Sequence, residues 1–326
     1  MRADTTNRGG YDVIGDIHGY AEPLDVLLDE LGYRVVDGSW QAPKDRQLVF
    51  VGDLIDRGPN QLRVLETVKS LVDAGVAQIT LGNHEFNAVC WSIENPAKNG
   101  TYLRPHNPKN WKQHHKFLGQ LTDEQCNEFI EWFLTLPLWL DLGGLRVIHA
   151  CWDEKSRRRL EKQLGGASFG TRQAVIDVVS DKKTRTAVDT LLKGPELSLE
   201  RHNLPKFLDK DGHPRGEARL KWWVRGTDRV VDLAEIPPRS KTEKKKPYPK
   251  IKRHLIADEA HQFDFHGGSP VIYGHYWRQR ADGIEIACTA DTACVDFSAG
   301  RGGPLAAYQW NTGDKVISGE NYVFHR

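Results

Sequence analysis

Short apolar runs alternate with amphipathic segments through the first 81 residues of the chain. Residues 11–14, 47–51 and 78–81 are compact, mostly apolar runs, the pattern of short buried strands. Between them, residues 23–31 and 60–74 repeat apolar side chains at intervals of three and four, which places them on one face of a helix. The order strand, helix, strand, helix, strand predicts an α/β domain with a largely parallel sheet.

The same pattern continues to about residue 150 and then changes. Residues 122–134 predict a further helix that Thr122 and Gln125 begin as a capping box, and residues 145–148 predict a strand. Residues 153–269 carry few strand signals and many charges, and seven prolines interrupt them (195, 205, 214, 237, 238, 247 and 249). We interpret this stretch as an insertion or cap over the core, partly loop.

Strand-like runs return near the C-terminus. They cover residues 271–273, 284–288, 294–297, 304–310 and 315–317. This closing series predicts a second, mostly antiparallel sheet packed on the first. The expected organisation is therefore three parts: residues 1–152 as the first half of an α/β core, residues 153–269 as the insertion, and residues 270–326 as the strands that complete the core.

The composition and the pattern of apolar residues argue against several classes of protein. The 326 residues contain 45 Lys and Arg against 44 Asp and Glu, which argues against a uniformly basic nucleic-acid-binding protein. No apolar run approaches the roughly 18 residues of a membrane-spanning helix. The first residues lack the apolar core of a signal peptide, so a cytoplasmic location is expected. Five cysteines without a Cys-x-x-Cys pair exclude a disulfide scaffold.

Side chains that bind metals recur where the predicted strands end. Asp16 and His18 follow the first strand, Asp53 follows the second, and Asn83 with His84 follows the third. His149 and His275 follow two later strands. Ligands of open α/β sheets bind at the carboxyl ends of strands, so these distant segments are expected to converge there. Any one of these residues alone is weak evidence, because a lone buried histidine is commonly a hydrogen-bonded core residue.

Three complete blocks are more specific than the single residues. Residues 15–19 (Gly-Asp-Ile-His-Gly), 52–58 (Gly-Asp-Leu-Ile-Asp-Arg-Gly) and 82–85 (Gly-Asn-His-Glu) resemble the signature of the calcineurin-like metallophosphoesterases. The Asp-Arg-Gly ending of the second block resembles the phosphoprotein phosphatase branch, which includes bacterial diadenosine tetraphosphate hydrolases. The resemblance extends to His149-Ala150, to residues 273–277 and to residues 295–305, but not to residues 153–269. It implies an α/β fold with a two-sheet β-sandwich flanked by helices.

The resemblance also implies a pair of divalent metal ions. Asp16, His18 and Asp53 would hold the first ion, and Asp53 would bridge to a second ion held by Asn83, His149 and His275. These Asp, Asn and His ligands suit Mn²⁺ best, with Fe or Zn²⁺ as alternatives. Two such ions polarise a phosphoryl group and lower the pKa of a bridging water, so a metal-bridging hydroxide is the expected nucleophile.

Five residues receive expected roles in catalysis or substrate binding. By the resemblance, His84 donates a proton to the leaving oxygen and Asp56 orients it. Arg57, with its planar guanidinium, and Asn83 would bind the substrate phosphate. Arg219 is a candidate for a second phosphate-binding arginine, although a plain surface arginine fits its sequence context equally well.

The substrate is expected to be a phosphorylated nucleotide, most closely a dinucleoside polyphosphate. A Ser/Thr phosphoprotein is the alternative, and a non-catalytic binding protein on the same fold is a remote one. Residues 239–253 contain eight Lys or Arg and one acid, Glu243. They favour a solvated loop over a nucleic-acid-binding surface. The sequence predicts no membrane association and leaves the oligomeric state open.

Overall fold

A computed structural model describes residues 9–209, 212–237, 239–261, 265, 267–279, 283 and 287–325. The first sheet has the order β16-β15-β1-β4-β5. The predicted strands form its parallel part, namely β1 (Gly10–Ile14), β4 (Arg46–Phe50) and β5 (Ala77–Ile79). The strands β15 (Ala306–Asn311) and β16 (Tyr322–Phe324) add to it in antiparallel orientation. A hairpin of β2 (Arg34–Val36) and β3 (Ser39–Gln41) lies outside this sheet.

The second sheet differs from the one expected. It has the order β14-β13-β7-β6, from β14 (Thr292–Cys294), β13 (Val271–Tyr273), β7 (Arg146–Ile148) and β6 (Trp139–Asp141). β13 runs parallel to both β14 and β7, and β6 alone is antiparallel. The prediction of a mostly antiparallel second sheet was wrong, because strand direction depends on partners far away in the chain.

Two other strand predictions were imprecise. Residues 315–317 form no strand, and Ile317 instead packs in the apolar core between the sheets. The predicted strand at 284–288 lies mostly outside the described residues, and Cys288 forms an isolated bridge with Ala293.

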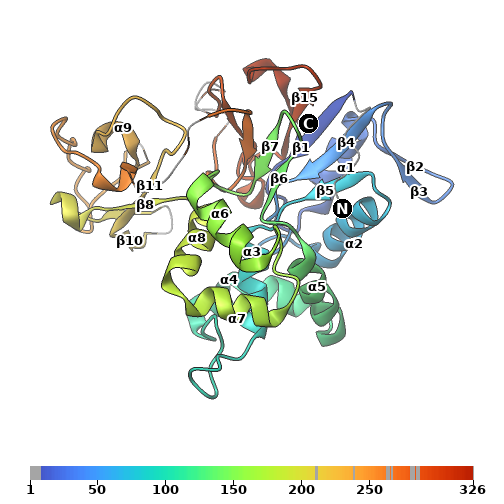
Figure 1. Ribbon diagram of the computed structural model, residues 1–326, viewed down its shortest axis with the longest axis horizontal. Coiled ribbons are helices and arrows are strands. Elements are labelled where there is room, and N and C mark those ends of the chain that lie inside the picture. Colours follow the sequence, from blue (N-terminus) through green and yellow to red (C-terminus); the bar gives the residue numbers. More distant parts are fainter. Residues whose placement is uncertain are drawn as a thin grey trace.

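Successive side chains along the strands of the first sheet point alternately into two apolar cores, one on each face of that sheet. Val13 and Val49 pack between the two sheets together with Val147 and Ile272 of the second sheet. Their neighbours Ile14, Leu48 and Phe50 point to the opposite face and contact helices. Because successive strand residues face opposite sides, one short strand serves both layers. The resulting sandwich flanked by helices agrees with the predicted fold class (Figure 1).

Helices cover the outer face of the first sheet and one end of the sandwich. They are α1 (Ala21–Glu30), α2 (Gln61–Asp73), α3 (Asn83–Ser92), α4 (Pro108–Gln120) and α5 (Asp123–Thr135). The capping box of α5 is confirmed, because the Thr122 hydroxyl accepts from Gln125 N and the Gln125 side chain accepts from Thr122 N. No helix in the described part of the chain has both the length and the apolar character to cross a membrane.

Residues 153–269 contain two different structures. The helices α6 (Glu154–Leu164), α7 (Arg172–Ser180) and α8 (Lys182–Lys193) pack into the main core through Leu160, Val175 and Leu191. This regular helical part was not anticipated. Where the insertion begins and ends stays a prediction.

Residues 196–261, called the lobe below, extend from the core at one side (Figure 1). The lobe contains β8 (Glu196–Ser198), β9 (Phe207–Leu208), β10 (Pro214–Arg215), β11 (Glu217–Leu220), α9 (Val230–Leu233) and β12 (Ala234–Glu235). It has its own apolar cluster, which includes Leu197 and Leu220. The basic residues 239–253 form mostly exposed loop in the lobe, outside the regular helices and strands given above.

Candidate functional site

The predicted ligands meet where strands of the two sheets end. Asp16 and His18 follow β1, Asp53 follows β4, and Asn83 and His84 begin α3 after β5. His149 follows β7, and His275 follows β13. Parallel pairing brings the carboxyl ends of β1, β4 and β5 to one edge, and the same holds for β7 and β13.

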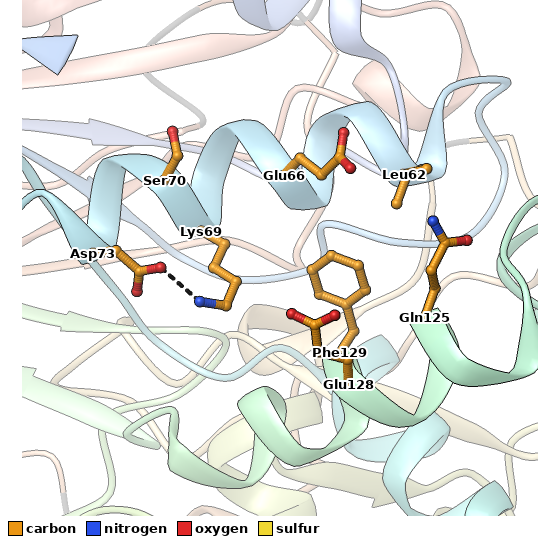
Figure 2. A pocket seen from close by; sticks show the side chains of 8 residues that line it. All are labelled: Leu62, Glu66, Lys69, Ser70, Asp73, Gln125, Glu128 and Phe129. Carbon is orange, nitrogen blue, oxygen red and sulfur yellow. Dashed lines mark hydrogen bonds and ion pairs between the residues drawn. The ribbon is translucent and has the colours of Figure 1, made fainter. Parts of the chain in front are cut away.

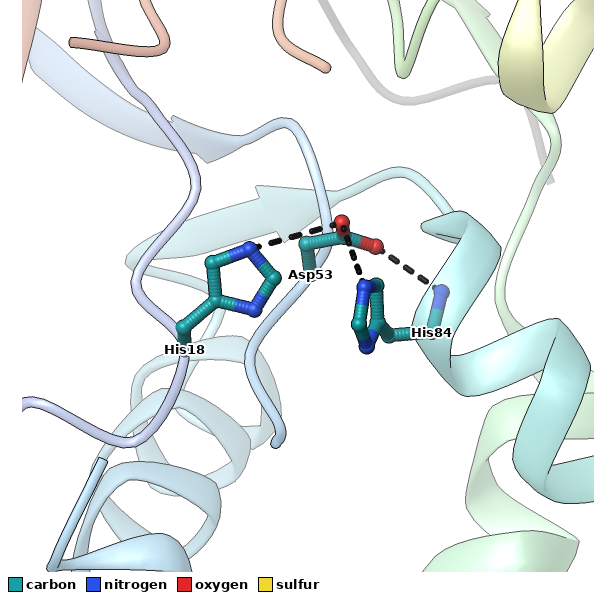
Figure 3. Close-up of side chains that lie close together, drawn as sticks. All are labelled: His18, Asp53 and His84. Carbon is teal, nitrogen blue, oxygen red and sulfur yellow. Dashed lines mark hydrogen bonds and ion pairs between the residues drawn. The ribbon is translucent and has the colours of Figure 1, made fainter. Parts of the chain in front are cut away.

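Asp53 is the centre of this group. Its Oδ2 lies 3.7 Å from His18 Nε2 and 3.8 Å from His84 Nε2 (Figure 3). Its other oxygen, Oδ1, lies 3.4 Å from His149 Nε2 and accepts a hydrogen bond of 2.9 Å from the backbone N–H of His84. Burial alone would raise the pKa of Asp53, but His149, His84 and His18 outweigh it and lower the pKa to about 2. The Asp53 carboxylate is therefore ionised and faces histidines on both sides.

Two groups of potential ligand atoms share Asp53. One contains His18, Asp53 and His84, and the other contains Asp53, His149 and His275, with the ligand atoms of each group within 4.8 Å of one another. Asn83 belongs with the second group, because its Oδ1 lies 3.1 Å from His149 Nε2. Asp53 is thus the residue that the two groups have in common, and its role as a bridge between two ions stays a prediction.

Two of these histidines are held by backbone oxygens. His18 Nδ1 donates to Ile55 O, and His149 Nδ1 donates to Val51 O, both at 2.8 Å. These bonds fix the tautomer and turn Nε2 of each ring towards Asp53. Carbonyl oxygens support histidine ligands in the same way at many metal sites.

Further carboxylates are buried beside Asp53. Asp16 is 2% exposed, and it accepts from the backbone N–H of His275 at 3.2 Å. Burial, Asp296 and Asp53 raise its pKa well above the ordinary value. Asp296 is itself buried, and burial raises its pKa as well. Buried carboxylates that repel one another need a cation or a proton to compensate them.

The donor set fits a pair of divalent cations. The buried Nε2 of His275 has no hydrogen-bond partner among the described residues, although it lies in the group around Asp53. An unpaired buried imidazole nitrogen next to clustered carboxylates is costly unless a ligand or an ion meets it. Oxygen and imidazole ligands without a thiolate suit Mn²⁺, Fe or Zn²⁺. Asp16, His18 and Asp53 would hold one ion, and Asp53, Asn83, His149 and His275 would hold the other.

Unusual backbone conformations gather at the site. His18, Asp53, Asp56, Arg57 and His275 all have positive φ, between 51° and 71°. Non-glycine residues rarely adopt this region, and such conformations persist where the surrounding structure imposes them. Gly274 serves close approach instead, because a Cβ there would lie 2.1 Å from Asp16 Oδ1. The chain thus accepts local strain to aim these side chains inward.

His84 is supported by Asp56, as predicted. Its Nδ1 lies 2.5 Å from Asp56 Oδ2, and His114 Nδ1 lies 3.0 Å from the other oxygen, Asp56 Oδ1. Burial opposes the charge on His84, but Asp53 and Asp56 outweigh burial and raise its pKa. His84 Nε2 remains directed at the centre of the site, where it could donate a proton (Figure 3).

The two predicted arginines come from different parts of the chain and reach the site in different ways. Arg57 is beside His18, because a Cβ added to Gly300 would contact both side chains. Burial lowers the pKa of His18 and the charge of Arg57 lowers it further, whereas at Asp16 the same charge only opposes the rise in pKa that burial causes. Arg219 comes from β11 of the lobe and donates through Nη1 to the backbone oxygen of His275 at 3.0 Å. Arg219 therefore reaches the rim of the site through the loop that carries His275.

Several supporting residues were missed in the sequence. Glu85 is fully buried and accepts from the backbone N–H groups of Asp53 and Leu54 at 2.8 Å, and of Gly82 at 3.1 Å. It therefore joins the second and third blocks. It stood in the motif of residues 82–85, and Asp296 stood in the resembling segment 295–305, so both had a signal. His114 had none, because it lies in an ordinary amphipathic helix.

Comparison with known proteins agrees with this geometry. Residues 11–276, which include every predicted site residue, match the family described as calcineurin-like phosphoesterase. The chain belongs to the calcineurin-like phosphoesterase family. Members use divalent metal ions, and the residues around Asp53 are the candidates for holding them here.

Two similar curated proteins share one name. A protein of Oceanobacillus iheyensis named bis(5'-nucleosyl)-tetraphosphatase PrpE (asymmetrical) is 34% identical over 142 residues, which are 43% of this chain and 54% of that protein. A protein of Halalkalibacterium halodurans with the same name is 46% identical over 74 residues, or 23% and 30% of the two chains. The chain spans about half the length, or less, of these curated relatives.

A solved structure supports the fold. The cold-active protein-tyrosine phosphatase of a Shewanella species superposes with a TM-score of 0.51 at 16% identity, covering 98% of this chain and 81% of that one. At this identity the likeness concerns the calcineurin-like phosphoesterase fold alone.

Proposed function

We propose that the protein is a metal-dependent hydrolase of phosphate esters or anhydrides, and that its substrate is a dinucleoside polyphosphate. The observation that carries the chemistry is Asp53, whose two oxygens face histidines from three different segments of the chain. The names of the PrpE relatives support the substrate class.

The reaction would be a direct transfer of a phosphoryl group to water. Two divalent cations, when bound by the residues around Asp53, would supply Lewis acidity that polarises the phosphoryl group and lowers the pKa of water. Arg57 would bind and orient the phosphoryl oxygens, because its guanidinium lies beside His18 without a carboxylate partner within ion-pair distance among the described residues.

His84 would donate the proton that the leaving group needs. An oxygen of water bonds to phosphorus and releases one proton to solvent, the bond from phosphorus to the leaving oxygen breaks, and the leaving oxygen keeps the electron pair. The proton on His84 Nε2 then passes to the leaving oxygen. Asp53 and Asp56 outweigh burial and raise the pKa of His84, which favours its protonated form, and Asp56 holds the ring in place.

The test is a paired assay with chelator-stripped, Mn²⁺-reloaded protein on diadenosine tetraphosphate and on a phosphothreonine peptide. Chromatography would separate AMP and ATP, which asymmetrical cleavage gives, from two ADP, which symmetrical cleavage gives. We expect nucleotide products in either ratio, a slow peptide reaction, and no reaction with Asp53→Asn. Phosphate released from the peptide with the nucleotide intact would make the protein a phosphoprotein phosphatase. No metal-dependent reaction on either substrate would favour a binding protein.

A further inference from the structure

A small pocket opens between α3, α8 and the loop before α4, next to the candidate site. Its volume is about 110 Å³. The polar side chains of its wall include Asn87, Arg104, Arg185, Asp189 and Lys193, and Cys90 forms part of its floor. Arg185, Asp189 and Lys193 are four residues apart on α8, so they lie along one face of that helix.

The pocket has an excess of positive charge. Lys193 Nζ pairs with Asp189 Oδ1 at 2.6 Å, and this pair cancels one cation against Asp189, the only acid among the described residues of the wall. Arg104 donates to two neutral amides, to Asn87 Oδ1 at 2.9 Å and to Gln113 Oε1 at 2.6 Å. Arg185 is exposed and makes no ion pair with any residue that the structure describes. Two arginines therefore remain without a counter-charge in one small concavity.

The pocket connects to the proposed proton donor. The carboxamide of Gln113 lies between Arg104 and His84, with Gln113 Nε2 at 3.4 Å from His84 Nε2. Asn87 lies four residues after Asn83 on α3, about one helical turn of roughly 5.4 Å from it. Because His84 Nε2 would meet the leaving oxygen, the pocket lies on the leaving-group side of the bond that breaks.

A larger groove elsewhere has the opposite character. Between α2 and α5 a groove of about 230 Å³ is lined by Glu66, Asp73 and Glu128, and Lys69 is paired with Asp73 at 2.6 Å (Figure 2). Its excess of carboxylates disfavours a phosphate. The volume of a concavity therefore does not identify the phosphate-binding site. The sign of the charge on its wall favours the smaller pocket.

We propose that the pocket of Arg104, Arg185 and Lys193 binds the phosphate that follows the scissile bond in the leaving group. The inference rests on the proposed function and narrows it to substrates with a phosphoanhydride bond. A volume of about 110 Å³ leaves room for one phosphate group. The planar guanidinium of an arginine can also donate hydrogen bonds to two phosphate oxygens at once.

The consequence is a preference between two kinds of leaving group. A tetraphosphate places an anionic phosphate in this pocket, whereas the leaving group of 4-nitrophenyl phosphate carries no phosphate that could bind there. The pocket residues should therefore favour hydrolysis of the tetraphosphate over hydrolysis of 4-nitrophenyl phosphate, because they would bind a phosphate that only the first leaving group has.

The experiment compares the unmodified protein with Arg185→Ala and Lys182→Ala, all reloaded with Mn²⁺. Arg185 is exposed, so its removal leaves the core intact. Lys182 is an exposed cation on the same helix outside the pocket and controls for net charge. We expect the ratio of kcat/KM for diadenosine tetraphosphate to that for 4-nitrophenyl phosphate to fall by about tenfold in Arg185→Ala, the loss of one hydrogen bond to a charged group. The ratio should keep its unmodified value in Lys182→Ala.

A binding measurement without metal gives a second readout. Calorimetric titration of tripolyphosphate into the chelator-treated protein should show a dissociation constant about tenfold weaker for Arg185→Ala than for Lys182→Ala. An unchanged activity ratio in Arg185→Ala, or an equal fall in Lys182→Ala, would overturn the pocket assignment while the hydrolase function stands. Hydrolysis of neither substrate by the unmodified protein would instead contradict the proposed function.

Discussion

The strand ends around Asp53 and the lobe of residues 196–261 are stabilised in opposite ways. Around Asp53, the buried side chains are mainly charged or polar, and they include Asp16, His18 and His149. In the described part of the lobe the buried side chains are apolar apart from Glu259, which pairs with His202 at 3.0 Å. The first region pays for burying charge, and the second gains from burying hydrocarbon.

The two regions differ in what stabilises them and in whether they carry the candidate site. The lobe can hold its shape through its own apolar cluster, whereas the strand ends depend on backbone hydrogen bonds and on whatever compensates their carboxylates. The two regions meet through several contacts: Arg219 donates to His275 O, Tyr276 donates to Leu220 O at 3.0 Å, and Trp222 Nε1 donates to Ala150 O at 2.9 Å. Disturbing either side therefore tests whether the lobe merely supports the site.

The largest effect is expected from Asp53→Asn. An amide keeps the shape but loses the charge that both ligand groups share, so metal content and activity should fall together. We expect turnover to drop by more than about 10³-fold, since several kcal/mol of charge stabilisation disappear. Metal analysis by plasma mass spectrometry, combined with turnover, would check this. A variant that kept two ions per chain would disprove the central role of Asp53.

His84→Asn should separate catalysis from metal binding. Loss of a proton donor lowers turnover by roughly 10²–10⁴-fold, while both ions should remain bound. His84 Nε2 is 3.8 Å from Asp53 Oδ2, close enough for a ligand role to be tested directly. Metal loss in this variant would show that His84 binds the ion rather than protonating the leaving group.

Leu197→Ala probes the lobe alone. Leu197 is fully buried in the lobe cluster, and a Leu→Ala change in such a position costs about 2–5 kcal/mol. Hydrogen exchange should accelerate in residues 196–220 and stay slow in β1 and β4, with metal content unchanged. Faster exchange in β1 as well would mean that the two regions unfold as one unit.

Metal removal should affect the strand ends in a pH-dependent manner. The pKa values of Asp16 and Asp296 are raised, so without metal these groups hold protons to higher pH, and their ionisation destabilises the fold as pH rises through those values. At low pH a metal ion must displace the protons on Asp16 and Asp296 before it can bind. At neutral pH the two groups are closer to their ionised form, so metal binding is stronger. At metal concentrations of about 100 Kd, binding at pH 7.5 should add about 2.7 kcal/mol to the free energy of unfolding.

Calorimetric scans of stripped and reloaded protein at pH 5 and pH 7.5 would measure this difference. The gain in Tm on reloading should be smaller at pH 5. An equal gain at both pH values would argue that Asp16 and Asp296 are not protonated in the metal-free protein.

The smallest effect is expected from Arg219→Ala. If Arg219 binds phosphate at the rim of the site, KM should rise by about tenfold with little change in kcat, the loss of one hydrogen bond to a charged group. If it only positions the His275 loop, metal affinity should weaken instead, by about 10-fold or more. Steady-state kinetics and a metal titration on the same variant distinguish the two roles.

Much of the site was predictable because its residues stand directly after strands. Asp16, Asp53, His149 and His275 needed only the rule that parallel strands deliver their carboxyl ends to one edge. The residues that support these side chains were harder to predict from the sequence. Glu85 and Asp296 lay within recognised segments but had no assigned role, and His114 reaches Asp56 across 58 residues without any local sign. Contacts of that kind arise from packing between helices, which periodicity does not record.

The sequence by itself determined β1, β4, β5, α1, α2 and α5 and the set of side chains at the strand ends, because apolar periodicity and motif order act within short stretches. The tertiary structure alone decided which sheet received the C-terminal strands, that α6–α8 join the main core, and that Arg104 and Arg185 share a pocket. Each of these depends on segments far apart in the chain. Their pairing is selected by the total burial and charge balance of the folded molecule, which no local pattern specifies.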